Sequence, residues 1–161
     1  LPDFSECTGV KRRQEILHDS EELVVLSDFA HHPTAIAGAL ESLRARWSGR
    51  KIIACFEPRS NTAVTNVFED RFANALGIAD VGLLGAVHRA EKIPEDQRIN
   101  TENMIQRIKD QGKSGHAFAT NQELETFLKS YHFSGPSLVV FFSNGSFDGV
   151  IDRFAESVKK S

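Results

Sequence analysis

Two strongly apolar segments constrain the fold of this chain more than any other feature of its sequence. Lys51-Ile-Ile-Ala-Cys-Phe56 is a continuous apolar run after its first residue, as expected of a strand that is covered on both faces. Ser137-Leu-Val-Val-Phe-Phe142 is the most strand-like segment in the chain. Both segments therefore predict strands of a sheet.

Segments with the apolar spacing of helices alternate with the predicted strands. A hairpin is expected from the short runs 14–18 and 22–27, with its turn at 18–21, and further strands at 81–86 and 116–119. Helices are expected from Pro33 to a stop at Gly49, over 66–76 and 101–111, after Thr120 as far as Tyr131, and over 149–159. This order predicts one α/β domain over residues 1–161, Rossmann-like, with about six mostly parallel strands and helices on both faces.

Two of the predicted helices open with a sequence typical of a capping box. Asn66 is followed three residues later by Glu69, and Thr120 is followed by Glu123. Gly77 follows the first of these helices at the position expected for its C-terminal end.

Charge and composition exclude several classes of function. The chain has 19 Lys and Arg residues against 22 Asp and Glu residues, a net charge of −3, and its basic residues are scattered. A nucleic-acid partner is therefore not expected. No apolar run approaches the roughly 18 residues that span a membrane, and no signal peptide opens the sequence, so no membrane partner is expected either. The two cysteines do not form a disulfide framework, and Cys55 in its apolar run is expected to be a reduced core thiol of a cytoplasmic protein. Because the sequence opens with Leu-Pro-Asp rather than Met, we also expect it to be part of a longer protein.

Ligands of mostly parallel α/β sheets bind at the loops that follow the carboxyl ends of the strands. This rule directs attention to the segments 28–34, 57–65, 87–92 and 143–148. In the first, Asp28, His31 and His32 precede a helix whose N-terminus favours anions. The alternative is that an Asp and a His only cap that helix. A metal site is disfavoured because no third ligand has suitable spacing.

The segments 57–65 and 143–148 are rich in polar groups. Arg59 offers a planar fork for a carboxylate or phosphate, and Ser60 and Asn61 add short donors and acceptors, although a simple surface turn is also possible. The glycines of Ser143-Asn-Gly-Ser-Phe-Asp-Gly149 would let the backbone approach a ligand closely. Phe147 within this loop either packs into the core or flanks a substrate.

One apparent nucleotide motif fails on inspection. Gly112-Lys-Ser114 resembles the end of a phosphate-binding loop, but the required earlier glycine is replaced by Arg107, and the segment follows a helix rather than a strand. No catalytic Ser-His-Asp or Cys-His set is evident from the spacing of these residues.

Asp28-Phe-Ala-His-His-Pro-Thr34 resembles the Asp-Tyr-Ala-His-His-Pro-Thr signature that opens the C-terminal domain of Mur ligases. Gly9-Val-Lys-Arg-Arg-Gln-Glu15 resembles the Gly-Val-x-Arg-Arg-x-Glu stretch at the start of the same domain, and 86–91 loosely resembles its later Ala-x-Glu segment. The three matches occur in the family's order and cover nearly the whole chain.

Within the family, the resemblance is nearest to the branch that recycles murein peptides. Glu57-Pro-Arg-Ser-Asn-Thr62 stands where the L-alanine-adding branch usually has a Gln-Pro-His-Arg-like stretch, and the 143–149 loop also resembles the recycling branch. Ser27, Phe29 and Ala35 depart from the aspartate, tyrosine and glutamate common in the alanine-adding branch.

The resemblance implies an ATP- and Mg²⁺-dependent ligase that converts the lactyl carboxylate of UDP-N-acetylmuramate into an acyl phosphate. The amine of the tripeptide L-Ala-γ-D-Glu-meso-diaminopimelate then attacks this group. It further implies an N-terminal domain that binds the uridine nucleotide and a central domain with the P-loop and Mg²⁺, both of them outside this sequence. The present domain would bring the peptide and close over ATP, and would be inactive alone.

Residue roles follow from the same resemblance. It implies that Arg13 and Asp28 contact the adenosine part of the nucleotide, and that His31 and His32 lie near the incoming amine. It also places the peptide's carboxylates near a set of polar side chains: Arg59, Ser60, Asn61, Ser143 and Asn144. It implies neither a catalytic residue nor a metal ligand within this domain alone.

Three other functions remain open at this point. The chain could belong to an L-alanine-adding muramate ligase, which would incorporate free L-alanine. It could be a stand-alone Rossmann-like module that binds a nucleotide or a small acid without chemistry. A hydrolase that uses His31 or His32 as a base is a third alternative.

Overall fold

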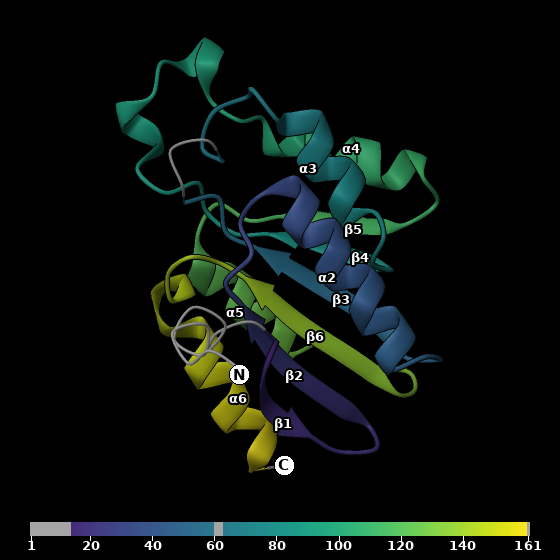
Figure 1. The fold of residues 1–161 in the computed structure, drawn as a ribbon. Coiled ribbons are helices and arrows are strands. Elements are labelled where there is room, and N and C mark those ends of the chain that lie inside the picture. The colour runs from purple at the N-terminus through teal and green to yellow at the C-terminus, as the bar shows by residue number, and fades with distance from the viewer. Residues whose placement is uncertain (1–13, 60–62, 161) are drawn as a thin grey trace, which may run out of the picture.

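The computed structural model describes residues 14–59 and 63–160, and it contains one six-stranded sheet with the order β1-β2-β6-β3-β4-β5 (Figure 1). Strands β2, β3, β4, β5 and β6 are parallel to one another, and only the edge strand β1 is antiparallel, to its neighbour β2. The strands are β1 Glu15–Asp19, β2 Leu23–Asp28, β3 Lys51–Phe56, β4 Val81–Leu84, β5 Ser114–Ala117 and β6 Ser137–Phe142. The predicted mostly parallel α/β sheet and its N-terminal hairpin are confirmed.

The strand predicted from 137 to 142 lies at the centre of the sheet and aligns its neighbours. Residue Phe142 at the end of β6 pairs with Asp28 of β2 on one side and with Phe56 of β3 on the other. Because these three strands are parallel and in this register, their carboxyl ends lie side by side. The loops that follow them therefore begin at one edge of the sheet.

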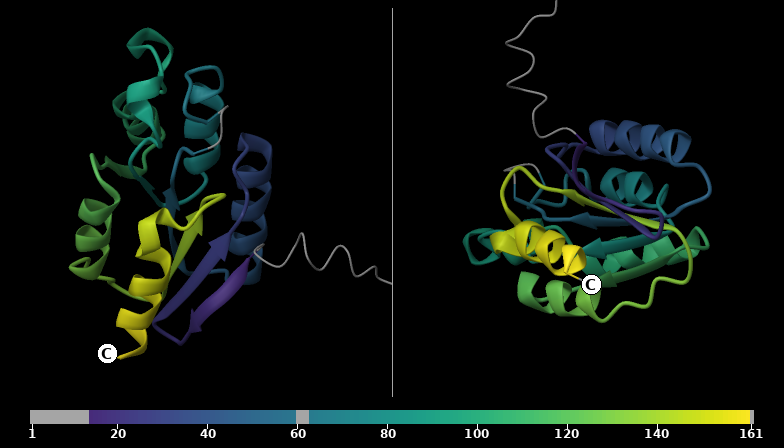
Figure 2. Two further views of the ribbon diagram at one scale, coloured as in Figure 1. Left: turned by 90° about the vertical axis from the view of Figure 1, so that its left-hand side faces the viewer. Right: turned by 90° about the horizontal axis from the view of Figure 1, so that it is seen from below.

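Helices cover both faces of the sheet (Figure 2). On one face lie α2 Pro33–Arg46, α3 Glu69–Leu76 and α4 Thr101–Asp110, and on the other lie α5 Asn121–Lys129 and α6 Val150–Lys159. Short 3-10 turns are η1 Ala90–Lys92, η2 Glu95–Gln97 and η3 Phe147–Gly149. No helix in this described part of the chain is long and apolar enough to cross a membrane.

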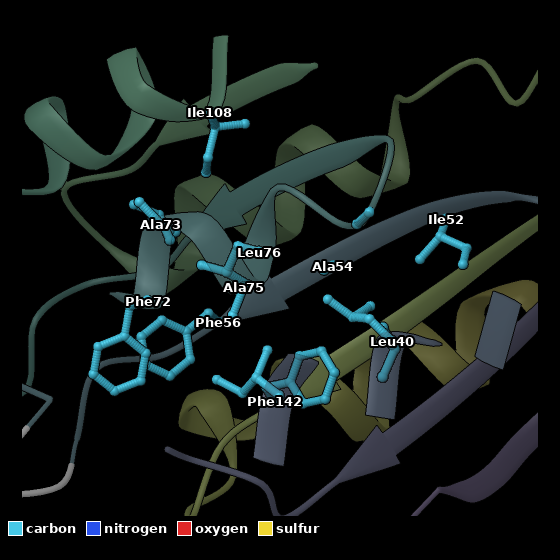
Figure 3. Packing of buried hydrophobic residues seen from close by; sticks show 14 of the residues in the cluster. Leu40, Ile52, Ala54, Phe56, Phe72, Ala73, Ala75, Leu76, Ile108 and Phe142 are labelled. Carbon is cyan, nitrogen blue, oxygen red and sulfur yellow. The ribbon is translucent and has the colours of Figure 1, made fainter. Parts of the chain in front are cut away.

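The sheet separates two hydrophobic cores because successive side chains of a strand point to opposite faces. In β3, Ile52, Ala54 and Phe56 pack against α2, α3 and α4, while Ile53 and Cys55 pack against α5 and α6. Figure 3 shows the first core, in which the rings of Phe56 and Phe72 stack with centroids 4.9 Å apart. Both faces of the central strands are thus buried, which explains their continuous apolar sequence.

The structure corrects the predicted start of helix α3. The helix begins at Glu69 rather than residue 66, its N-cap is Phe68, and no side-chain cap forms. The amide of Asn66 donates to the carbonyl of Asp96, and the carboxylate of Glu69 accepts from the N–H of Asn100. The predicted capping box is therefore wrong, because both side chains bind the loop that leads into α4.

The other predicted cap is present, whereas two strand boundaries move. Thr120 caps α5 by accepting from the N–H of Glu123 at 3.1 Å. Strand β4 ends at Leu84, two residues earlier than predicted. Strand β5 covers Ser114–Ala117 rather than 116–119, because its pairing with β4 begins at Ser114 opposite Val81. Short edge strands of this kind are set by pairing more than by their own pattern.

Candidate functional site

The four loops singled out in the sequence start from one edge of the sheet, and backbone hydrogen bonds join them. The N–H of Ser143 donates to the carbonyl of Asp28 at 3.2 Å, and that of Glu57 donates to Phe142 at 3.1 Å. Farther along, the N–H of His88 donates to the carbonyl of Pro58 at 2.9 Å. The loops after β2, β6, β3 and β4 therefore form one continuous polar edge.

The first loop runs from β2 into α2. Asp28 is buried, and its Oδ1 accepts from the N–H of Ala30 at 2.8 Å. Nδ1 of His31 lies 2.9 Å from the carbonyl of Phe29, and His32 is the N-cap residue of α2 without a side-chain capping bond. Asp28 and His31 therefore hold the turn before the helix, and neither Asp28 nor a histidine makes a side-chain capping bond to α2.

An open cleft of about 770 Å³ lies between this loop and the outer side of α2. Its rim carries a row of rings, with 5.4 Å between the centroids of Phe29 and His31 and 5.0 Å between those of His31 and His32. Phe29 is 39% exposed, which is unusual for a large apolar side chain in this molecule. Exposed ring faces next to a helix N-terminus suit a planar group that carries negative charge. The lining residues are Gln14, Asp28, Phe29, Ala30, His31, His32, Ala35, Gly38, Ala39, Ser42 and Arg46.

The second loop begins with Glu57, whose carboxylate is the centre of a buried hydrogen-bond network. Its Oε1 accepts from Oγ of Ser143 at 2.7 Å and from the N–H of Phe147 at 3.1 Å. Its Oε2 accepts from Nδ2 of Asn121 at 3.0 Å. Since Glu57 is only 3% exposed and all three groups donate, the site requires an acceptor at both oxygens.

Arg59 extends from this loop over the start of the 143–149 loop. Its Nη1 lies 3.9 Å from Oε2 of Glu57 and 3.3 Å from Nδ1 of His88. Because arginine only donates, Nδ1 of His88 accepts, and a neutral His88 carries its proton on Nε2. A Cβ at Gly145 would lie 2.5 Å from Nε of Arg59, so the guanidinium rests against bare backbone. Its side chain is 29% exposed and can still meet a ligand.

The loop 143–149, which follows β6, is held partly by hydrogen bonds to Glu57. The hydroxyl of Ser143 donates to Glu57 and accepts from the N–H of Gly145 at 2.9 Å. Oδ1 of Asn144 is buried and has no hydrogen-bond partner among the described residues. Phe147 is fully buried and packs edge to face on Phe141, so it is a core residue rather than a residue flanking a substrate.

The structure brings together some of the candidate side chains and leaves others untested. Arg59, Ser143 and Asn144 lie on one side of the polar edge, and Asp28, His31 and His32 line the cleft at α2. Arg13, Ser60 and Asn61 lie outside the described residues. Their proposed roles, like all the ligand contacts implied by the resemblance, stay predictions. Within residues 14–59 and 63–160 no group of three or more His, Cys, Asp or Glu side chains could hold a metal ion.

Glu57 and Asn121, which organise the site, were not assigned a role from the sequence. Glu57 was noticed only as part of a motif, and its burial could have been expected from its place directly after an apolar strand. Asn121 gave no signal at all, because an asparagine in the first turn of a helix is an ordinary surface residue.

A protein-family model described as "Mur ligase, glutamate ligase domain" matches residues 12–145 of this chain. A UDP-N-acetylmuramate–L-alanine ligase from Sulfurihydrogenibium sp. (strain YO3AOP1) is 30% identical over 92% of this chain and 32% of its own length. A protein of the same name from Streptococcus suis (strain 05ZYH33) is 31% identical over 94% of this chain and 33% of its own length. The chain thus spans about a third of the length of these curated relatives.

Solved structures give a similar picture. A murein peptide ligase from Psychrobacter arcticus 273-4 superposes with a TM-score of 0.74 at 26% identity, covering 94% of this chain and 30% of that one. A UDP-N-acetylmuramate–alanine ligase from Thermotoga maritima superposes with a TM-score of 0.70 at 25% identity, covering 92% of this chain and 30% of that one. Both similarities cover more than nine tenths of this chain.

Proposed function

The chain belongs to the Mur ligase family as its C-terminal domain, and on that premise we propose that it carries the incoming peptide in an ATP-dependent ligase of peptidoglycan metabolism. We propose that the amine substrate is the tripeptide L-Ala-γ-D-Glu-meso-diaminopimelate and that the acceptor is UDP-N-acetylmuramate. The enzyme would work in the cytoplasm, together with its own N-terminal and central domains.

The observation that carries this proposal is the seating of Arg59. Its guanidinium lies against the backbone of Gly145 and beside Glu57 and His88, at the edge where the loops of a parallel sheet meet ligands. A fixed and partly exposed guanidinium suits a carboxylate, because its donors match the two oxygens of that group. A peptide with several free carboxylates needs at least one such cation.

The choice of the tripeptide over L-alanine is supported by Glu57. The three hydrogen bonds to its carboxylate all come from donors, and the guanidinium of Arg59 adds positive charge nearby. A glutamine, which the alanine-adding branch usually has at this position, would turn an NH₂ group toward one of these donors. The network is therefore built for the acid found in the recycling branch.

ATP would bind between this domain and the missing central one. The cleft at α2 is our candidate for the adenosine part of the nucleotide, because Asp28 lines it beside the exposed ring of Phe29. ATP supplies the phosphoryl group that activates the lactyl carboxylate. Arg13 and Asp28 would hold the adenosine, while Mg²⁺ and the phosphates would be held mainly by the central domain. Gly112-Lys-Ser114 lies at the opposite edge, where β5 begins, so it is not placed to help.

The contribution of this domain to the chemistry would be positional. Arg59 would hold a peptide carboxylate, while His31 and His32 would lie near the attacking amine. Closure of the domain would exclude water from the activated carboxylate and align the amine with it. Ser60, Asn61, Ser143 and Asn144 would complete the peptide site.

The proposal is tested by phosphate release from the complete enzyme with ATP, Mg²⁺ and UDP-N-acetylmuramate, with tripeptide or L-alanine added separately. Release that depends on the tripeptide is expected. The variant Arg59→Ala should raise the KM for the tripeptide about 10- to 100-fold, as loss of a charge-assisted hydrogen bond would. Arg107→Ala is the matched control, because Arg107 pairs with Asp70 on the outside of α3 and α4. An unchanged KM in Arg59→Ala would remove Arg59 from the peptide site.

An L-alanine-adding ligase is the second candidate, because relatives that are 30–31% identical over more than 90% of this chain carry that name. Release that depends on L-alanine and not on the tripeptide would establish it. If neither the tripeptide nor L-alanine supports phosphate release by a folded enzyme, a binding module without chemistry becomes the better interpretation.

A further inference from the structure

The side chain of Asn121, at the start of helix α5, hydrogen-bonds to three different loops at the polar edge of the sheet. Asn121 is the first residue of α5 and is only 3% exposed. Its Oδ1 accepts from the N–H of Ala86 at 2.8 Å, and its Nδ2 donates to Glu57 at 3.0 Å and to Oδ2 of Asp148 at 2.9 Å. One amide therefore connects the loops that follow β3, β4 and β6.

The orientation of this amide is determined by its partners. The N–H of Ala86 can only donate, so it must face the oxygen of Asn121. The nitrogen of the amide must then face the carboxylates of Glu57 and Asp148, which only accept when ionised. Leucine has nearly the same size but none of these bonds, and aspartate keeps the shape but loses both donated hydrogens.

The space around Asn121 is closed on the side of β4. A Cβ at Gly85 would lie 2.5 Å from Oδ1 of Asn121 and 2.8 Å from Cε1 of Phe147. The amide is therefore packed against the strand end as well as hydrogen-bonded to it. A side chain that is held in this way transmits its position to its partners.

The loop on the far side of Asn121 has an unfavourable backbone conformation. Phe147 and Asp148 have φ angles of 56° and 54°, in the left-handed region that L residues avoid, and Gly149 follows with 85°. Such a conformation persists where the surroundings determine it, and it is common at functional sites. Here the N–H of Phe147 is held by Glu57, and the side chain of Asp148 is held by Asn121.

We propose that Asn121 is a positioning residue of the peptide site, which acts through Glu57 on Arg59 and through Asp148 on the Ser143–Gly149 loop. This inference rests on the proposed function, since it assigns Asn121 to the site where Arg59 would hold the peptide carboxylate. Asn121 touches no substrate itself. It keeps the Glu57 carboxylate oriented toward Ser143 and Phe147, and so keeps the two loops of the site in register.

The test uses the complete ligase with Asn121→Leu and Asn121→Asp, and Leu128→Ala as the control. Leu128 is buried near the other end of α5, so its truncation destabilises the same helix without touching the network. Both Asn121 variants should raise the KM for the amine substrate about 10- to 100-fold, with the KM for UDP-N-acetylmuramate unchanged. Leu128→Ala should leave both KM values unchanged.

Hydrogen exchange of the same proteins gives a readout that does not depend on activity. The segment 143–149 should exchange faster in both Asn121 variants and remain as in the wild type in Leu128→Ala. If the wild-type enzyme has no ligase activity while the Asn121 variants still exchange faster over 143–149, the proposed function fails and the positioning role of Asn121 stands. An active ligase with unchanged exchange and unchanged KM in Asn121→Asp would overturn the positioning role. Failure of both Asn121 variants to fold would overturn it too, because Asn121 would then be a residue for stability alone.

Discussion

Replacing Gly85 by alanine should destabilise this protein, although the same substitution at Gly38 should stabilise it. Gly85 follows β4, and an added Cβ would lie 2.5 Å from Oδ1 of Asn121 and 2.8 Å from Cε1 of Phe147. Carbon atoms in comfortable contact are about 3.5–4.0 Å apart, so both neighbours would have to retreat by about 1 Å. Phe147 is fully buried and cannot move outward without opening the core.

The magnitude follows from what the retreat disrupts. Overpacking of a close-packed site costs about 1–3 kcal/mol, and a weakened hydrogen bond from Ala86 to Asn121 adds about 0.5–1.5 kcal/mol. Alanine also restricts the unfolded chain, which offsets about 0.4–1 kcal/mol. We expect Gly85→Ala to lower the free energy of unfolding by about 1–3 kcal/mol.

Gly38 provides the matched control. It lies inside α2, and a Cβ there would have no neighbour within 4 Å. Alanine at this helical position should raise the free energy of unfolding by about 0.5–1 kcal/mol. Urea unfolding followed by the fluorescence of Trp47, the only tryptophan, measures both variants. A Gly85→Ala protein as stable as the wild type would refute the packing argument for Asn121 and Phe147.

Two further predictions concern ionisable groups that are not proposed to contact a ligand. Hydrogen bonding from Arg153, with a smaller contribution from Lys129, holds the pKa of Glu125 below its ordinary value, so this stabilisation is present above about pH 4.3 and is lost as the pH falls through the lower folded pKa. Glu125→Gln should therefore be less stable than the wild type by about 1 kcal/mol at pH 7, a small value because Arg153 is half exposed. Urea unfolding should show this difference shrinking below about pH 4.3. A difference in stability that stays constant down to pH 3 would contradict the prediction. Burial raises the pKa of the Cys55 thiol, so in a Cys7→Ser background Ellman's reagent at pH 8 should titrate one thiol only after unfolding, and rapid reaction of the native protein would show that Cys55 is accessible.

The layout of the site at the carboxyl edge of the sheet could be anticipated, but its internal connections could not. Asp28, Arg59 and Ser143 were expected there because each follows a predicted parallel strand, and the loops do meet at that edge. That Ser143 would donate to Glu57, 86 residues away, depends on the order in which β3 and β6 pair. Sequence spacing carries no information about that order.

The sequence by itself determined the succession of strands and helices, the burial of both faces of the sheet and the family signature. It could do so because apolar periodicity is local and reports directly which face of an element is buried. Only the tertiary structure decided the partners of buried polar groups, such as the three bonds of Asn121 or the use of Asn66 and Glu69 by a loop instead of a helix. A buried polar side chain bonds to whichever group the folded chain brings within reach, and a short edge strand such as β5 begins where its neighbour begins. Both outcomes depend on three-dimensional register, which no local pattern of residues encodes.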